Sequence, residues 1–203
     1  AVLREFELSL RAIFVHYAKG TGRIGNEMDS IKLLSFIEWK QLIKDLKLLG
    51  ADFTDRELAL SFIWSRMRIV DDRKLNSRKK LAQLSFEDFL EAIVRCATMK
   101  VLPNDETVQE HDCIDAGEFI HKLREEEPAK YALFLAQNEQ EWDDPLTQPI
   151  SKLVDSMCIY IVRTVKMIVT DEGLQQHTKD MDALTAANVK TFQKLARMQT
   201  TKE

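Results

Sequence analysis

One short pattern occurs twice in this chain, at positions 50 residues apart. Leu34–Trp39 and Leu84–Phe89 each begin with leucine, serine and phenylalanine, and each ends with an acidic residue followed by an aromatic one. Both copies lead into a stretch with helical hydrophobic spacing. A single helix-loop-helix unit cannot bury its own apolar face, whereas two units can share a core. The repeat therefore predicts a pair of such units in the first half of the chain.

The repeat resembles the exit half of an EF-hand, in which a short loop strand turns into a helix and an acidic residue is the twelfth loop position. In this resemblance Glu38 and Asp88 close the two loops. The implied fold is all-α: a degenerate EF-hand-like helix-loop-helix pair with enlarged loops, followed by a helical extension that contains a long amphipathic helix.

Composition supports an all-helical chain. Only 6 Gly and 4 Pro occur among 203 residues, too few for the many tight turns of a sandwich or barrel. With 45% hydrophobic and 31% charged residues, the chain has an ordinary globular balance. The cysteines, Cys96, Cys113 and Cys158, lack metal-site spacing, so we expect buried thiols in a reducing compartment.

Residues 1–100 are expected to form the EF-hand-like module. Thr54 and Glu57 match a capping box, which satisfies the free amide groups at a helix start, and Gly50 matches a helix cap. Four helices are expected in this module. One ends near Ala18, one runs from about Ser35 to Leu49, one begins at Thr54 and one begins at Ser85.

Residues 101–113 are expected to be a polar connector, and residues 114–203 a helical extension, with packing on the first module as one option. In residues 149–171 apolar side chains form one stripe over about five turns, so this helix needs a partner, either another helix or a second copy of the chain. The expected helices of the extension are Asp115 to Glu126, Pro128 to about Trp142, Pro149 to about Asp171, and roughly Leu174 to Met198.

The loops do not match a calcium site. Counting back twelve positions from Glu38 puts Ile31 at the fifth position, which needs an oxygen ligand, and Lys32 at the sixth, which needs glycine. Ala18 to Glu38 spans 21 residues and Arg66 to Asp88 spans 23, so both loops are enlarged. We expect no metal site, and a scaffold that kept the helix pairing without the ion. The alternative is a calcium-responsive sensor or adaptor that binds a target helix.

A basic run in the second loop is the best candidate binding feature. Between Ser65 and Lys80 seven cations face two acidic residues, a local charge of +5 in a chain with a net charge of -4. Such a run attracts an acidic protein surface, and without a partner it is a solvated loop. Nucleic acid is disfavoured because no aromatic residues interleave the cations. The candidate partner-binding residues are Arg66, Arg68, Arg73, Lys74, Arg78, Lys79 and Lys80.

No pattern in the sequence argues for catalysis. The glycines of residues 20–25 spell a dinucleotide fingerprint, but they belong to no strand-helix-strand unit. No serine or cysteine lies in a nucleophile motif, and the histidines are scattered. We therefore expect no enzyme, no catalytic residue and no cofactor. The longest uninterrupted apolar run near the chain's most apolar part, Met157–Val162, is too short to cross a bilayer, and no signal peptide is visible.

Residues 8–97 resemble the tubulin polymerization-promoting protein family. The resemblance depends on hydrophobic spacing together with Met28, Trp39 and the pair Lys44-Asp45, while residues 100–203 depart from that family. It implies a protein that binds tubulin or microtubules. Our expectation is a non-enzymatic cytoskeletal or ciliary scaffold or adaptor, located in the cytoplasm, at the cytoskeleton or in a cilium or flagellum, with self-association through the 149–171 helix as a further option.

Overall fold

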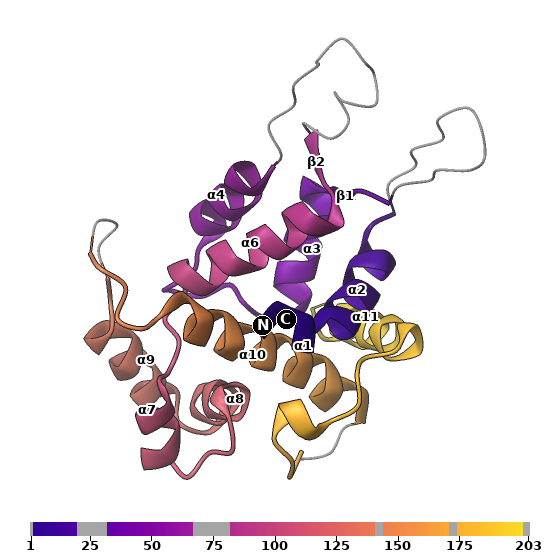
Figure 1. The fold of residues 1–203 in the computed structure, drawn as a ribbon. Coiled ribbons are helices and arrows are strands. Elements are labelled where there is room, and N and C mark those ends of the chain that lie inside the picture. The colour runs from indigo at the N-terminus through magenta and orange to yellow at the C-terminus, as the bar shows by residue number, and fades with distance from the viewer. Residues whose placement is uncertain (1, 20–31, 67–81, 141–143, 171–173, 201–203) are drawn as a thin grey trace, which may run out of the picture.

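The structure is a computed structural model that describes residues 2–19, 32–66, 82–140, 144–170 and 174–200 (Figure 1). These residues form an all-α fold, and the strands among them make one two-stranded sheet. Among the helices of these described ranges, none combines the length and apolar character needed to span a lipid bilayer.

The first half of the chain contains two units, in each of which a helix is followed further along the chain by a short strand and a second helix. The strands β1 and β2 pair antiparallel, with Leu34 opposite Leu84 and Ser35 opposite Gln83. The first residues of the two repeated patterns therefore face each other, as a paired arrangement requires. The elements are α1 (Val2–Glu5), α2 (Glu7–Tyr17), β1 (Leu34–Ser35), α3 (Phe36–Asp45), α4 (Asp55–Ser65), β2 (Gln83–Leu84) and α6 (Phe86–Met99).

Three of these helices begin with a capping box. At each start a hydroxyl side chain accepts a hydrogen bond from a backbone amide of the first turn, and an acidic side chain accepts one from the amide of the capping residue. This confirms the helix start predicted at Thr54. The capping pairs are Ser35 with Glu38 in α3, Thr54 with Glu57 in α4, and Ser85 with Asp88 in α6.

The second half of the chain is built around one long helix. α10 lies between α6 and α8 in Figure 1 and also packs against α11. Every residue from Met157 to Val165 is buried, so the apolar stripe predicted for this helix has its partners within the chain. Self-association is therefore not needed to cover it. The elements are α7 (Asp105–Glu110), α8 (Ala116–Glu126), α9 (Pro128–Gln137), α10 (Ile150–Thr170), the short 3-10 helix η1 (Thr178–Asp180) and α11 (Ala186–Thr200).

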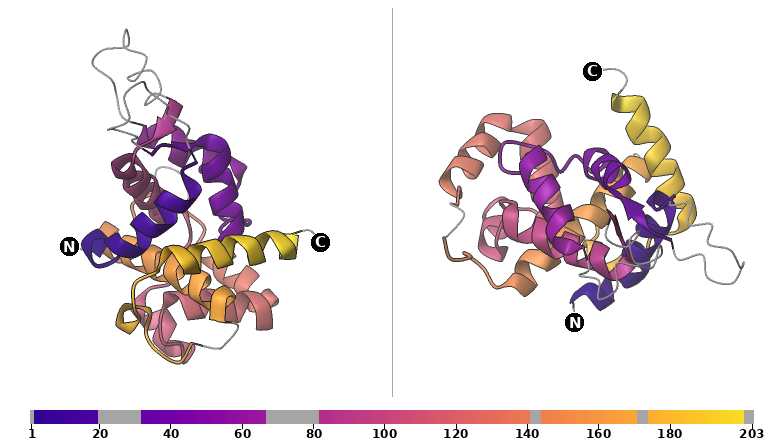
Figure 2. Two further views of the ribbon diagram at one scale, coloured as in Figure 1. Left: turned by 90° about the vertical axis from the view of Figure 1, so that its right-hand side faces the viewer. Right: turned by 90° about the horizontal axis from the view of Figure 1, so that it is seen from above.

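The hydrophobic core is shared by both halves. Leu10 and Phe89 from the first half, and Ile120 and Phe192 from the second, belong to one cluster of buried side chains. α11 packs against α2 as well as α10, and both views of Figure 2 show it beside the indigo α2. The last helix therefore folds back onto the chain rather than projecting from it.

One predicted helix end and the predicted connector need correction. α3 ends at Asp45 and not near Leu49, because Lys47 adopts a left-handed backbone conformation with φ 53°. The connector at residues 101–113 contains α7, whose first turn is capped by the Asn104 side chain, which accepts from the Thr107 amide at 2.7 Å. Local capping thus made a helix where polar composition had suggested only a linker.

The predicted boundaries around α9, α10 and α11 also shift. α9 ends at Gln137, ahead of the expected Trp142, and α11 begins at Ala186 instead of near Leu174. Between α10 and α11, the described residues Leu174–Thr185 form a strap with only the short helix η1. Several of its backbone groups are bound by side chains from other parts of the chain, so these groups are not available for an α-helix.

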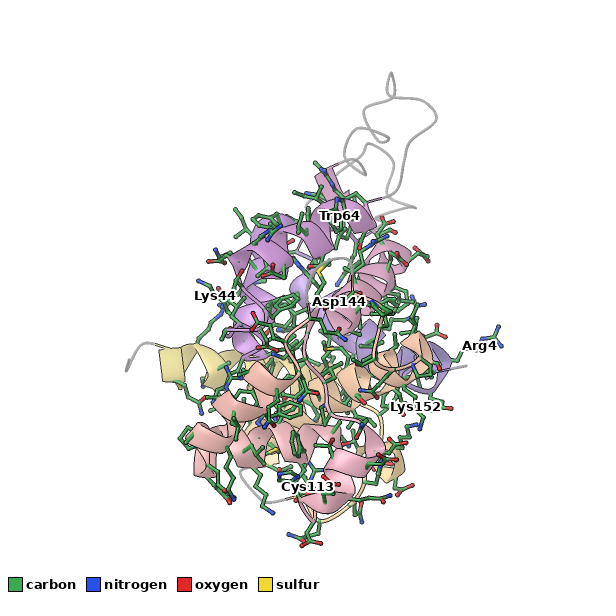
Figure 3. The ribbon with its side chains drawn as sticks, turned by 90° about the vertical axis from the view of Figure 1, so that its left-hand side faces the viewer. Arg4, Lys44, Trp64, Cys113, Asp144 and Lys152 are labelled. Carbon is green, nitrogen blue, oxygen red and sulfur yellow. The ribbon has the colours of Figure 1, made fainter. Side chains whose placement is uncertain are left out.

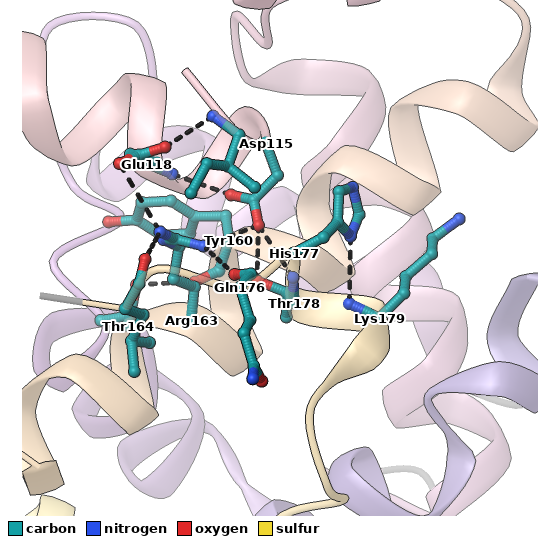
Figure 4. Close-up of polar contacts among 11 residues, drawn as sticks. Asp115, Glu118, Tyr160, Arg163, Thr164, Gln176, His177, Thr178 and Lys179 are labelled. Atoms are coloured by element: carbon teal, nitrogen blue, oxygen red, sulfur yellow. Dashed lines mark hydrogen bonds and ion pairs between the residues drawn. The ribbon is translucent and has the colours of Figure 1, made fainter. Parts of the chain in front are cut away.

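Asp115 and Arg163 hold this strap in place (Figure 4). Asp115 Oδ2 accepts from Arg163 Nη1 at 2.8 Å, from the Thr178 amide at 3.0 Å and from the Thr178 hydroxyl at 2.7 Å. Arg163 also donates to the carbonyl oxygens of Gln176 at 3.1 Å and Leu174 at 2.7 Å. The side chains of both Asp115 and Arg163 are almost fully buried. Since a buried charge needs a partner, this network ties α8, α10 and the strap together.

Candidate functional site at the paired loops

The Glu38 carboxylate, the twelfth position in the calcium-loop count, accepts hydrogen bonds from the chain through both of its oxygens. Oε2 accepts from the Ser35 amide at 2.8 Å and from the Ser35 hydroxyl at 2.9 Å. Oε1 accepts from the Lys19 amide at 3.1 Å. Lys19 follows the end of α2, so the carboxylate links the start of α3 directly to the end of α2.

Lys32 brings a positive charge to the same unit. Its ammonium donates to the Val15 carbonyl at 2.8 Å, in the last turn of α2. The C-terminal end of a helix carries partial negative charge and favours a cation. Lys32 is the sixth position by the calcium-loop count, so a covalently attached cation lies in the loop region and opposes the approach of a divalent ion.

The second unit repeats the capping arrangement. Asp88 Oδ2 accepts from the Ser85 amide at 3.0 Å and from the Ser85 hydroxyl at 2.9 Å, and Asp88 is buried. Within the part of the chain that the structure describes, no three His, Cys, Asp or Glu side chains gather as a metal site would require.

Arg66 is the described residue of the predicted basic site. It directly follows α4, and its guanidinium carbon lies 6.0 Å from the centre of the Phe62 ring. Its Nε donates to the Ile63 carbonyl at 3.4 Å. The other six candidates, Arg68, Arg73, Lys74, Arg78, Lys79 and Lys80, lie outside the described residues.

Large apolar side chains are exposed at the end of the molecule where Arg66 lies. Phe36 is 38% exposed, Ile37 80%, Ile63 47% and Trp64 42%. The rings of Phe36 and Phe62 meet edge to face with centroids 5.2 Å apart, which places the start of α3 beside the end of α4. Figure 3 shows Trp64 at the end of the molecule that carries the sheet. Sequence periodicity assigned Ile63 and Trp64 to α4, but it could not show that both side chains are exposed.

A cavity of about 70 Å³ lies near the end of α6, and its walls include Lys100. The Lys100 ammonium is 2.8 Å from Asp52 Oδ2, and both side chains are buried. Burial lowers the pKa of Lys100, and Asp52 opposes that shift. The volume is far below that of a typical ligand pocket. Its other polar walls are amides and hydroxyls, from Thr98, Asn104, Asn138, Gln140, Thr147 and Gln148.

The structure brings together one group of charged residues that the sequence did not suggest. His16 on α2 and Gln193 on α11 share a hydrogen bond of 3.1 Å between Nε2 and Oε1. Burial lowers the pKa of His16, and the nearby cations Lys19, Lys32 and Arg197 lower it further, while the hydrogen bond to Gln193 Oε1 raises it. No local pattern reveals this group, because His16 and Gln193 are 177 residues apart.

Comparison with protein-family models, with curated proteins and with solved structures gave no match for this chain. The class is therefore stated from the structure alone. It is an all-α protein in which two pairs of helices meet through a short antiparallel sheet, and the long helix α10 joins them to the second half of the chain.

Proposed function

We propose that this chain is a non-enzymatic scaffold or adaptor of the cytoskeleton or cilium, associated with microtubules and built on an EF-hand-like module that works without calcium. The observation that carries the proposal is the set of hydrogen bonds that the Glu38 carboxylate accepts from Ser35 and Lys19. These bonds join the start of α3 to the residues after α2, as a bound ion would join the two ends of its loop. The helices on either side of the loop are joined without metal.

Sheet register supports the EF-hand-like part of the proposal. If Glu38 is loop position twelve, Ser35 is position nine and Leu34 is position eight. Leu34 pairs with Leu84, which holds the same place before Ser85 and Asp88 in the second unit. The two loops thus meet at equivalent positions, as expected of two related units around a pseudo-twofold axis.

The contacts of Glu38 oppose calcium binding. A calcium loop uses the side chain at position twelve as a bidentate ligand. Glu38 could do so only by giving up its bonds to Ser35 and Lys19, and hydrogen bonds to charged groups contribute about 1.5 to 3 kcal/mol each. Lys32 adds electrostatic repulsion near the loop.

The position of α10 favours a module of fixed shape. Calcium sensors work by exposing an apolar groove when the ion changes the angle between helices. Here α10 packs against α6, and Tyr160 donates to the Leu46 carbonyl just after α3 at 2.9 Å. A change in helix angle would have to break these contacts, so the arrangement suits an adaptor that presents a constant surface.

The basic run and the family resemblance point to an acidic partner. Seven cations between Ser65 and Lys80 would be attracted to an acidic protein surface, and the resemblance to the tubulin polymerization-promoting protein family implies tubulin. We therefore assign the microtubule contact to this run, whose first residue, Arg66, directly follows α4.

Co-pelleting with microtubules tests the proposal. We expect the chain to pellet with microtubules in a salt-sensitive manner. Neutralising the five cations Arg73, Lys74, Arg78, Lys79 and Lys80 to glutamine should remove most of the binding. A matched control neutralises five exposed cations of the described residues, Arg4, Lys44, Arg56, Lys130 and Lys152, and should bind as the unchanged chain does. Equal loss in both variants would contradict the basic run as the contact, and no binding by the unchanged chain would contradict the microtubule assignment.

A further inference from the structure

The end of α2 and the helix α11 form one continuous surface. His16 and Gln193 share a hydrogen bond, and the Leu184 amide donates to the Ser9 hydroxyl at 2.9 Å. Val189 and Phe192 are fully buried on the inner side of α11. These contacts fix α11 along α2, and Figure 2 shows the two helices side by side.

The side of α11 next to Gln193 is cationic. Lys190, Lys194 and Arg197 follow one another at spacings of four and three residues, which places them on one side of the helix. Lys190 and Lys194 are exposed, and Arg197 is near enough to lower the pKa of His16. α11 contains no acidic residue along its whole length from Ala186 to Thr200. Its charge is therefore not neutralised from within the helix.

Lys19 and Lys32 extend this positive charge beyond α11. Both side chains are exposed, and both act on His16 together with Arg197. Among the described residues, the charged groups that shift the pKa of His16 are the cations Lys19, Lys32 and Arg197. The residues come from three separate segments, namely the end of α2, the residues before β1, and α11.

The carboxylates of α3 are already engaged. Asp45 is buried, and it accepts from the Tyr17 hydroxyl at 2.6 Å and from the Gln41 amide at 2.6 Å. Glu38 is held by Ser35 and Lys19 as described above. Neither carboxylate can turn outward to pair with the exposed lysines without losing these bonds.

We propose that the cationic surface formed by Lys19, Lys32, Lys190 and Lys194 binds a carboxylate-rich peptide segment of a partner protein. The cations are exposed and lie on α11, just after α2 and just before β1, which fits a row of carboxylates along an extended or helical peptide. A phosphate group needs donors that converge on one point. The described cavity lies elsewhere, beside Lys100.

Other anionic partners fit the surface less well. An anionic membrane extends beyond the cationic surface and would repel the rest of a molecule whose net charge is -4. A peptide contacts only the cationic surface. The residues of the surface include no exposed aromatic side chain on which nucleic-acid bases could stack. A peptide partner uses the local charge and avoids the acidic remainder.

This surface is separate from the basic run at residues 66–80 and does not depend on the microtubule assignment. A labelled glutamate-rich peptide, titrated with the full chain and followed by fluorescence anisotropy, tests it. The variant Lys19→Glu/Lys190→Glu/Lys194→Glu should bind the peptide at least about tenfold more weakly, since three favourable charge contacts become repulsive. The matched control Arg4→Glu/Arg56→Glu/Lys130→Glu has the same change in net charge at exposed positions of α1, α4 and α9, and should retain the affinity.

Equal affinity of the two variants would overturn the proposal, because the peptide would then respond only to net charge or to the basic run. Phosphatidylserine vesicles are a second probe, and binding to vesicles without binding to the peptide would also overturn it. A milder variant, Lys190→Gln/Lys194→Gln, guards against a folding defect, since it removes charge without introducing repulsion. It should weaken binding in proportion to the charge removed, and the binding should fall as salt rises.

Discussion

The Tyr160 hydroxyl donates a hydrogen bond of 2.9 Å to the carbonyl oxygen of Leu46, which lies 114 residues earlier in the chain. Leu46 is the capping residue directly after α3, so its carbonyl has no partner within the helix. Arg124 on α8 supports the same turn by donating to the carbonyl oxygens of Lys47 and Leu49. The second half of the chain therefore supplies the cap of a helix in the first half.

Replacing Tyr160 with phenylalanine should lower the free energy of unfolding by about 1 to 2 kcal/mol, because it leaves a buried carbonyl without its donor. Urea unfolding followed by circular dichroism measures the change. Tyr131→Phe is the control, since the described residues show no hydrogen bond to its half-buried hydroxyl. If both changes had the same small effect, the capping role of Tyr160 would be wrong.

Asp115 and Arg163 should behave as one unit. Arg163→Leu leaves the Asp115 carboxylate buried without its ion-pair partner and should cost about 3 to 5 kcal/mol of stability. The double variant Asp115→Asn/Arg163→Leu should recover part of that loss, because it leaves no buried charge. A double-mutant cycle on urea midpoints measures the coupling, and the exposed pair Glu7 and Arg11 serves as a reference with a coupling of about 0.5 kcal/mol or less. Additive losses at Asp115 and Arg163 would contradict the network.

How much of this fold could be predicted depends on how local its causes are. The repeat at Leu34 and Leu84 and the capping box at Thr54 are local, and the helix start at Thr54 and the all-α class were predicted correctly. The strap was predicted as part of a helix, because the contact that holds it in a non-helical conformation is distant in the sequence. Asp115 accepts a hydrogen bond from the Thr178 amide across 63 residues. The end of α3 was placed too late for the same kind of reason.

Prediction of the candidate site met the same limit. The sequence showed that the loop ending at Glu38 lacks calcium ligands. It did not show that the Lys19 amide would donate a hydrogen bond to the Glu38 carboxylate. The basic run was visible because its cations lie close together in the sequence. The cationic surface around His16 was not visible, because Lys19 and Lys194 come together only when α11 folds back onto α2.

Calcium should give no micromolar binding isotherm in calorimetry with this chain. Glu38 is held by Ser35 and Lys19, and Lys32 repels a divalent ion. The thermal midpoint should likewise be unchanged by added calcium, since only a ligand that binds the folded state raises it. A micromolar isotherm that disappears in Glu38→Gln would favour the calcium-responsive sensor instead.

Gly117 should tolerate no side chain. A Cβ atom there would lie 3.0 Å from Arg163 Cδ, 3.1 Å from Arg163 Cβ and 3.2 Å from the Tyr160 Cα, where α8 crosses α10. Helix propensity alone predicts that Gly117→Ala stabilises α8 by about 1 kcal/mol. The close approach predicts the opposite sign, a loss of about 1 to 3 kcal/mol. The sign of the change in the urea midpoint distinguishes the two, and a gain in stability would contradict the packing.

Stability should fall between pH 6.5 and about pH 4 because of His121. This imidazole is buried and stacked on Tyr160, and its Nε2 lies 2.8 Å from the Thr164 hydroxyl. Burial, together with the cations Lys47, Arg124 and Arg163, lowers its pKa to about 4, from the ordinary value of 6.5. In this window the unfolded chain binds a proton that the folded chain does not, so acid favours unfolding, by up to about 3 kcal/mol.

The measurement is the urea midpoint at pH 7 and at pH 4.5 for the chain and for His121→Gln. Glutamine keeps an amide donor near Thr164 but cannot take up the proton, so the variant should lose less stability between the two pH values. The comparison isolates His121 from groups of opposite sign, such as Asp45, whose pKa is raised by burial so that acid favours its folded form. An identical pH dependence in both proteins would show that the imidazole is not held neutral by its surroundings.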